Sequence, residues 1–136
     1  MHTEEKNEQN IRQQEAVHRL HECCTEENLW RCIAEFQNTR MWTASGLPFQ
    51  YKLKVGRNGR FTKELWVDRR EDSKSLAWSS IVLALGNIKE EVVDRPKALG
   101  DIRGVTYIYG MFYQFGLIDV PDKVKEKMGR PINRKK

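Results

Sequence analysis

The stretch from residue 49 to residue 67 constrains the fold most, because apolar and polar residues alternate on both sides of a glycine-rich turn. Successive side chains of a strand point to opposite faces, so this period predicts strands at about 49–55 and 61–67. Between them the chain reads Gly-Arg-Asn-Gly-Arg, which is typical of a tight connection between antiparallel strands. The sequence therefore predicts one long antiparallel β-hairpin.

The length of the turn follows from the requirement that one face of the hairpin be apolar. A two-residue turn at Asn58 and Gly59 would place Val55 opposite Thr62 and mix apolar with polar residues on each face. A three-residue loop with Gly59 in the left-handed conformation instead pairs Val55 with Phe61. The same register predicts the pairs Tyr51–Leu65, Phe49–Val67, Lys54–Thr62, Lys52–Glu64 and Gln50–Trp66, and leaves Lys63 opposite Leu53 as the one charge on the apolar face.

Helical periodicity precedes the hairpin. Apolar residues recur at a loose helical spacing from Ile11 onward. Thr25 suits the N-cap of a second helix, because two glutamates follow it where the helix dipole favours negative charge. Residues 1–10 are polar and have no apolar period, so we expect a disordered or frayed N-terminus there.

Helical periodicity also follows the hairpin. Asp72 or Ser73 can cap a helix whose apolar residues continue through the segment 78–88. The segment 105–115 fits two structures, because its β-branched and aromatic content suits a strand while its apolar residues share one helical face. Gly116 stands where a C-terminal glycine of a helix belongs, so we favour the helix.

These elements predict an α+β fold with N-terminal helices, the hairpin, and then two helices packed on the hairpin's apolar face. A single domain is expected over residues 11–120, followed by a basic, mobile tail over 121–136. A lone hairpin is only marginally stable, so either helices cover it or a second copy pairs with it in a homodimer.

Length and composition limit the classes of protein to which this chain can belong. The 136 residues fit one domain, and no apolar run approaches the length that spans a membrane. The polar, acidic start does not match a secretory signal. The three cysteines are an odd number and lie within ten residues, which does not indicate a disulfide framework and favours a reducing cytoplasm.

The candidate ligands and nucleophiles do not form a recognisable site. His18, His21 and Cys24 share a helical spacing beside Cys23, but the pattern differs from zinc sites and no His or Cys follows Cys32. A thiol and an imidazole on one short helix also form no cleft for nucleophilic catalysis. We therefore predict a non-enzymatic protein with no metal and no other cofactor.

The net charge of +5 is unevenly spread and favours a negatively charged partner, either nucleic acid or an acidic protein surface. Residues 46–72 hold seven Lys and Arg against four Asp and Glu, and residues 119–136 hold seven against three. Phosphates attract such cations, a two-stranded ribbon fits the major groove, and an aromatic ring can stack on a base or on neighbouring lysines. The predicted contact residues are Lys52, Lys54, Arg57, Arg60, Trp66, Arg69 and Arg70.

The leading hypothesis is a small nucleic-acid-binding or regulatory protein that uses the basic hairpin and the basic tail. The alternative is a protein-interaction module, such as a small inhibitor or adaptor that binds a nucleic-acid-handling complex. The salt dependence of binding to DNA and RNA separates the two, because only direct phosphate contact releases counterions from the nucleic acid.

Overall fold

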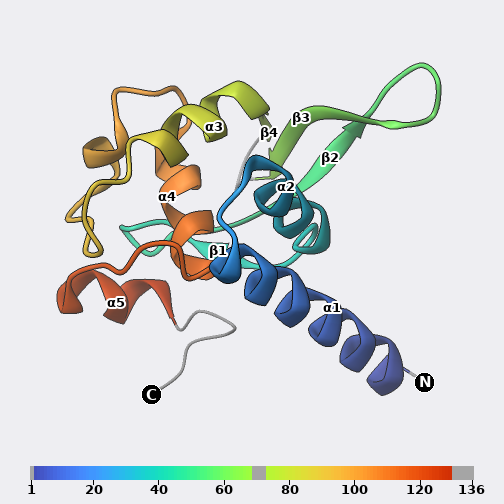
Figure 1. The fold of residues 1–136 in the computed structure, drawn as a ribbon, viewed down its shortest axis with the longest axis horizontal. Helices are drawn as coiled ribbons and strands as arrows, with labels where there is room; N and C mark the ends of the chain where they lie inside the picture. The colour runs from blue at the N-terminus through green and yellow to red at the C-terminus, as the bar shows by residue number, and fades with distance from the viewer. Residues whose placement is uncertain (1, 69–72, 130–136) are drawn as a thin grey trace.

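The computed structural model describes residues 2–68 and 73–129, which form an α+β fold (Figure 1). Within these residues a four-stranded antiparallel sheet has the order β1-β2-β3-β4, so neighbours in sequence are neighbours in the sheet. The strands are β1 (Met41–Trp42), β2 (Pro48–Val55), β3 (Phe61–Asp68) and β4 (Ser73–Ala77). The helices are α1 (His2–Glu22), α2 (Glu26–Glu35), α3 (Trp78–Gly86), α4 (Val105–Gln114) and α5 (Asp122–Met128), with a 3₁₀ turn η1 (Pro96–Leu99).

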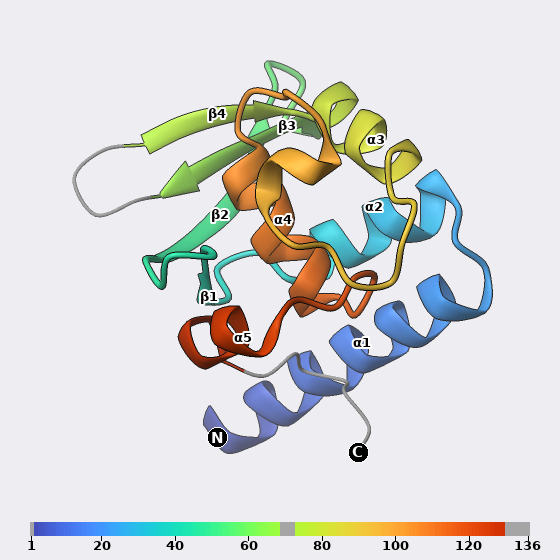
Figure 2. The same cartoon turned by 90° about the vertical axis from the view of Figure 1, so that its left-hand side faces the viewer.

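Helix α4 lies at the centre of the core, which confirms the helix predicted for this segment. Every residue from Ile108 to Phe115 is buried, and Figure 2 shows α4 surrounded by the sheet and the other helices. Gly110 permits this position, because a Cβ there would lie 2.7 Å from the carbonyl oxygen of Trp42. Gly116, with φ +75°, follows the helix as predicted.

The inner face of the hairpin packs against helices, as the sequence predicted. Phe49 of β2 meets Tyr107 of α4 edge to face, with ring centroids 5.2 Å apart. The buried Tyr51 hydroxyl donates a hydrogen bond to the carbonyl oxygen of Ile33 in α2 at 2.7 Å. The sheet therefore contacts both the N-terminal helices and the later ones.

The turn of the hairpin is the predicted three-residue loop. The Gly56 N–H donates to the Arg60 carbonyl at 2.8 Å, and the Gly59 N–H donates to the Gly56 carbonyl at 3.0 Å. Gly59 has φ +78°, which is the left-handed conformation that this loop requires. Val55 pairs with Phe61, so the first predicted pair is confirmed.

From Leu53 toward the body of the molecule the predicted register is wrong, whereas the pair Lys54–Thr62 stays a prediction. An irregularity between Leu53 and Val55 shifts the pairing by two residues, so that Leu53 pairs with Leu65 and not with Lys63. The shift removes a charge from the apolar row and replaces it with a leucine pair, which explains why it is favoured. Tyr51–Val67, Lys52–Trp66 and Gln50–Asp68 replace the predicted pairs Tyr51–Leu65, Phe49–Val67, Lys52–Glu64 and Gln50–Trp66.

The segment after the hairpin corrects a second prediction. Ser73 begins strand β4 and caps no helix, and α3 begins only at Trp78. Leu76 of β4 is buried and pairs with Leu65, so the short strand gains its stability from the core. Asp72, the other predicted cap, lies outside the described residues.

The N-terminal helices extend further than their apolar pattern. Helix α1 begins at His2, well before the predicted start at Ile11. The predicted cap of α2 is confirmed, because the Thr25 hydroxyl oxygen accepts a hydrogen bond from the Asn28 N–H at 3.1 Å. The fraying expected of residues 1–10 stays a prediction.

The C-terminal segment is a docked helix in the part that the structure describes, where the sequence predicted a mobile tail over 121–136. Met128 of α5 is buried, and the Tyr113 hydroxyl donates to the Gly129 carbonyl at 2.8 Å. Val124 and Met128 lie one helical turn apart, which gives this lysine-rich helix an apolar side. The remainder of the predicted tail lies outside the described residues.

Candidate nucleic-acid interface

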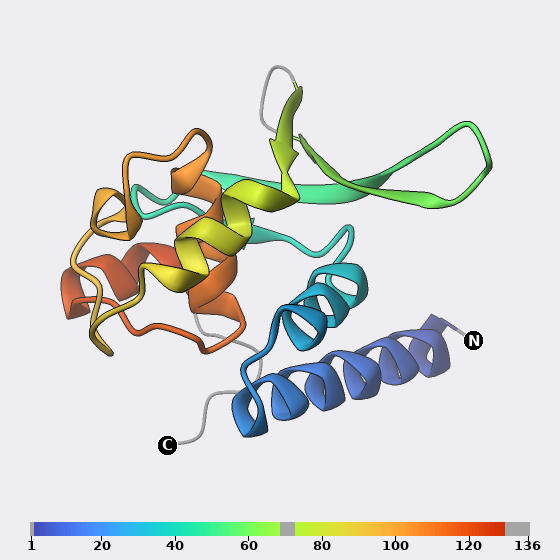
Figure 3. The ribbon, with the colours of Figure 1, turned by 45° about the horizontal axis from the view of Figure 1, so that its top comes forward.

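The turn end of the hairpin leaves the body of the molecule. Figures 1 and 3 show the connection between β2 and β3 projecting away from the helices. Strand β4 pairs with β3 only from Glu64 to Asp68, so the hairpin beyond Glu64 is a ribbon of two strands. We name residues 54–62 the arm.

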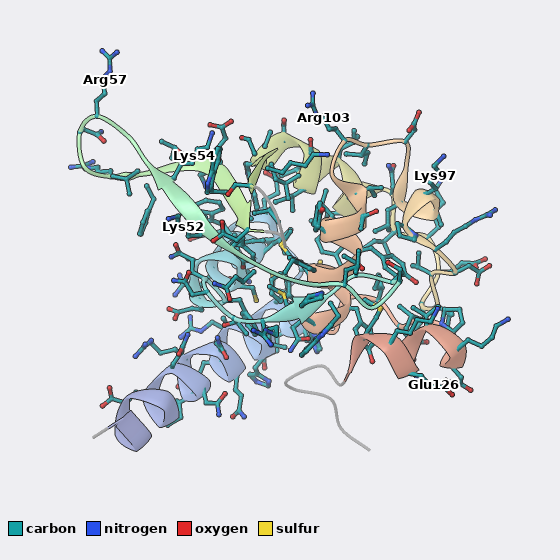
Figure 4. The ribbon with its side chains drawn as sticks, turned by 180° about the vertical axis from the view of Figure 1, so that it is seen from behind. Lys52, Lys54, Arg57, Lys97, Arg103 and Glu126 are labelled. Carbon is teal, nitrogen blue, oxygen red and sulfur yellow. The ribbon has the colours of Figure 1, made fainter. Side chains whose placement is uncertain are left out.

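The arm carries exposed cations at its tip. Arg57 and Arg60 are both exposed, and a Cβ added at Gly59 between them would meet no atom within 4 Å. Figure 4 shows Arg57 at the tip, pointing away from the molecule. Neither arginine forms an ion pair with a carboxylate of the described residues. Both guanidinium groups are thus available to an external anion.

The lysines lie further from the tip, on the outer face of the sheet. The Lys54 ammonium is 4.7 Å from the centre of the Trp66 ring and 3.5 Å from a carboxylate oxygen of Glu64. Glu64 also accepts a hydrogen bond from the Ser75 hydroxyl at 3.1 Å. Of the two contacts considered for Trp66, a base or the neighbouring lysines, the structure shows the contact with Lys54, whose charge is also shared with a carboxylate of the same face.

The predicted contact residues therefore separate into groups. Lys52, Lys54 and Trp66 share the outer face, Arg57 and Arg60 lie at the tip, and Arg69 and Arg70 lie outside the described residues. Glu64 and Asp68 each lie two residues from Trp66 along β3, so they share the outer face with the two lysines and balance their charge. Among the described residues of the outer face and the tip, the excess positive charge belongs to the two arginines.

Sequence reasoning missed the exposure of Val55 and Phe61, because the alternating pattern assigned both residues to a buried face. They form a cross-strand pair, yet Val55 is 62% exposed and Phe61 is 58% exposed. The signal that could have found them is their place beside the turn, at the end of the strands furthest from the residues that helices cover.

A cation–π cluster fixes the root of the arm, where β3 meets two helices. The Lys63 ammonium lies 4.0 Å from the ring centre of Trp30 and 5.1 Å from that of Trp78. The two indoles meet edge to face, with their centroids 5.0 Å apart. Trp30 belongs to α2 and Trp78 begins α3, so the residue predicted to spoil the apolar face instead ties the arm to both helices.

The three cysteines of the chain differ in exposure. Cys23 and Cys24 are exposed free thiols, and Cys32 is a buried free thiol whose pKa is raised by burial, and by nearby Glu35, to about 12. A thiol with so high a pKa is a poor nucleophile near neutral pH. Within residues 2–68 and 73–129 no group of three or more His, Cys, Asp or Glu is placed to hold a metal ion.

A second basic region lies away from the arm. Lys74 and Lys97 line a hollow of about 280 Å³ beside the first turn of α4, together with Asp101. Figure 4 shows Lys97 on the opposite side of the molecule from Arg57. The two regions can therefore be tested by separate substitutions.

Comparison of the chain with protein-family models, curated proteins and solved structures gave no match. In the described part of the chain, no helix combines the length and the apolar character needed to cross a membrane.

Proposed function

We propose that this protein binds nucleic acid with the arm and acts as a non-enzymatic regulator. The observation that carries the proposal is the projection from the body of the turn that holds Arg57 and Arg60, with no described carboxylate paired with either arginine. An arginine can form paired hydrogen bonds with a phosphate or with a guanine edge. Displacement of counterions from the phosphates then supplies affinity that does not depend on sequence.

The shape of the arm supports the same proposal. A two-stranded ribbon is narrow enough to enter a groove of duplex DNA. Lys52 is exposed on the outer face behind the tip, where a phosphate at the rim of a groove would lie. The basic residues after Gly129 offer a second, nonspecific contact, and the free thiols favour a reducing, cytoplasmic setting.

The test is the salt dependence of binding to a mixed-sequence DNA duplex, measured by fluorescence anisotropy between about 50 and 200 mM salt. Replacing Arg57 and Arg60 together with Ala leaves the fold intact, because both side chains are exposed on a turn. The slope of log K against log salt is expected to flatten by roughly 0.9 for each phosphate that the variant no longer neutralises. The matched control is Lys97→Ala, which removes an exposed lysine on the opposite side and leaves the slope nearly unchanged.

A truncation after Gly129 separates the arm from the C-terminal cations. This end point preserves α5, whose Met128 is buried, whereas a cut at Asp119 would remove a docked helix. If the truncation abolishes binding while the double Ala variant binds like the intact protein, the proposal is wrong. If the intact protein binds neither DNA nor RNA at about 50 mM salt, a protein-interaction module replaces it.

A further inference from the structure

We propose that Phe61, supported by Val55, is a wedge that inserts between stacked base pairs of duplex DNA and kinks the duplex. This inference rests on the proposed function and adds a mode of contact to it. The arginines of the tip would hold the phosphates, while the apolar pair would act on the base stack.

Folding alone does not account for the apolar pair. In the same two strands Leu53 is 4% exposed and Leu65 is 0% exposed, whereas Val55 is 62% and Phe61 is 58% exposed. Single exposed apolar residues are common on protein surfaces, but these two adjoin each other across a projecting ribbon. Adjacent exposed apolar side chains are typical of interaction sites, so their presence at the end of the arm favours a partner.

The surroundings of the pair select stacked bases as that partner. Gly56 and Gly59 keep the turn thin, and Arg57 and Arg60 place two positive charges beside the apolar pair. A base step offers the complementary arrangement, with flat apolar surfaces inside and phosphates on both flanks. Proteins that kink DNA from the minor groove combine cations with an apolar side chain inserted between base pairs in this way.

Duplex DNA suits this arm better than duplex RNA. The deep, narrow major groove of A-form RNA excludes protein side chains, and its minor groove is wide and shallow. The undistorted minor groove of DNA is too narrow for a two-stranded ribbon. A wedge that unstacks a base step kinks the duplex and opens this groove, so the cations and the wedge can act together.

The root of the arm supplies the rigidity that a wedge needs. Unstacking a base step costs a few kcal/mol. A mobile ribbon would also lose conformational entropy when it binds, and this loss would weaken binding further. Lys63 over the rings of Trp30 and Trp78 fixes β3 where the arm leaves the body. The buried pair Leu53–Leu65 lies in the same part of the hairpin. These contacts fix the part of the hairpin from which the arm projects.

The experiment uses the intact protein and a mixed-sequence DNA duplex with a flexible TA step at its centre and 2-aminopurine beside that step. Fluorophores at the two ends report bending by energy transfer, and 2-aminopurine fluorescence reports unstacking. The wild-type protein is expected to raise both signals. Phe61→Ala is expected to lose both, to weaken binding about tenfold, and to keep the salt slope, because phenylalanine carries no charge.

The control variant is Leu83→Ala, which truncates an apolar residue of α3 that is 57% exposed and is expected to change neither signal. Binding by the wild type without unstacking or bending overturns the wedge and leaves the proposed function standing. Unstacking by Phe61→Ala at the wild-type level also overturns the wedge. Absence of salt-dependent binding by the wild type removes the proposed function and this inference with it.

Discussion

The two halves of the β2–β3 hairpin share one alternating pattern but have opposite surroundings. In the half next to the body, Tyr51, Leu65 and Val67 are fully buried, and helices cover them. In the arm, Val55 and Phe61 continue the pattern, yet more than half of each side chain is exposed. Periodicity thus identifies the apolar face of a strand, but only the tertiary structure decides whether another element covers it. In the described chain, the half with exposed apolar side chains is the one that can offer them to a partner.

Truncation in the buried half gives the largest expected effect. Leu65→Ala leaves a cavity beside Leu53 and Leu76, and we expect it to lower the free energy of unfolding by about 2–5 kcal/mol in urea denaturation. Phe61→Ala removes a larger side chain from the same strand and is expected to change stability by no more than about 0.5 kcal/mol. Equal losses of stability would mean that the arm packs on the body in solution, and the contrast between the halves would fail.

A change in the turn tests whether the arm has the described backbone. Gly59→Val places a β-branched residue at φ +78°, and we expect a loss of about 1–2 kcal/mol in the free energy of unfolding. No neighbour lies within 4 Å of the added Cβ, so the loss comes from the backbone conformation and not from a clash. Gly59→Asn is the control, since asparagine tolerates the left-handed region and should cost less. Equal stability of the valine variant and the wild type would contradict the three-residue loop.

A smaller loss of stability than in the turn is expected at the boundary between the two halves. Lys63→Met keeps an aliphatic chain but removes the ammonium from the rings of Trp30 and Trp78, and is expected to lower stability by about 0.5–1 kcal/mol. Thermal unfolding compared with Lys52→Met, an exposed lysine that the structure does not place over an indole, measures the difference. A larger loss of stability in the Lys52 variant would show that the cluster does not anchor the arm.

The sequence predicted correctly those features that depend on a few neighbouring residues. The alternation of the hairpin, the left-handed Gly59, the cap at Thr25 and the helix ended by Gly116 each depend on a few neighbouring residues. The α+β class followed from the order of these elements. The register did not, because an irregularity between Leu53 and Val55 shifts the pairing by two residues, and the alternating pattern carries no signal for it.

The short elements β4 and α5 and the exposure of Phe61 could not be predicted, because each depends on contacts between segments that are distant in the sequence. Strand β4 and helix α5 are each stabilised by a buried residue, Leu76 or Met128, whose burial depends on elements far away in sequence. The cations of the candidate interface were visible in the sequence, and the structure adds that Arg57 and Arg60 form no ion pair with carboxylates of the described chain. The exposure of Phe61 depends on how much of the hairpin the helices cover, and the alternating pattern does not contain this information.

Amide chemical shifts of the isotope-labelled protein, recorded while a mixed-sequence DNA duplex is added, show which part of the protein contacts DNA. We expect the perturbed amides to cluster in the arm, from Val55 to Phe61, and those of Tyr51 and Leu65 in the covered half to change little. Perturbations confined to the hollow around Lys74 and Lys97, or to the segment after Gly129, would contradict the claim that the arm is the contact surface. The same would follow if no amide moved at about 50 mM salt, where phosphate contacts are strong.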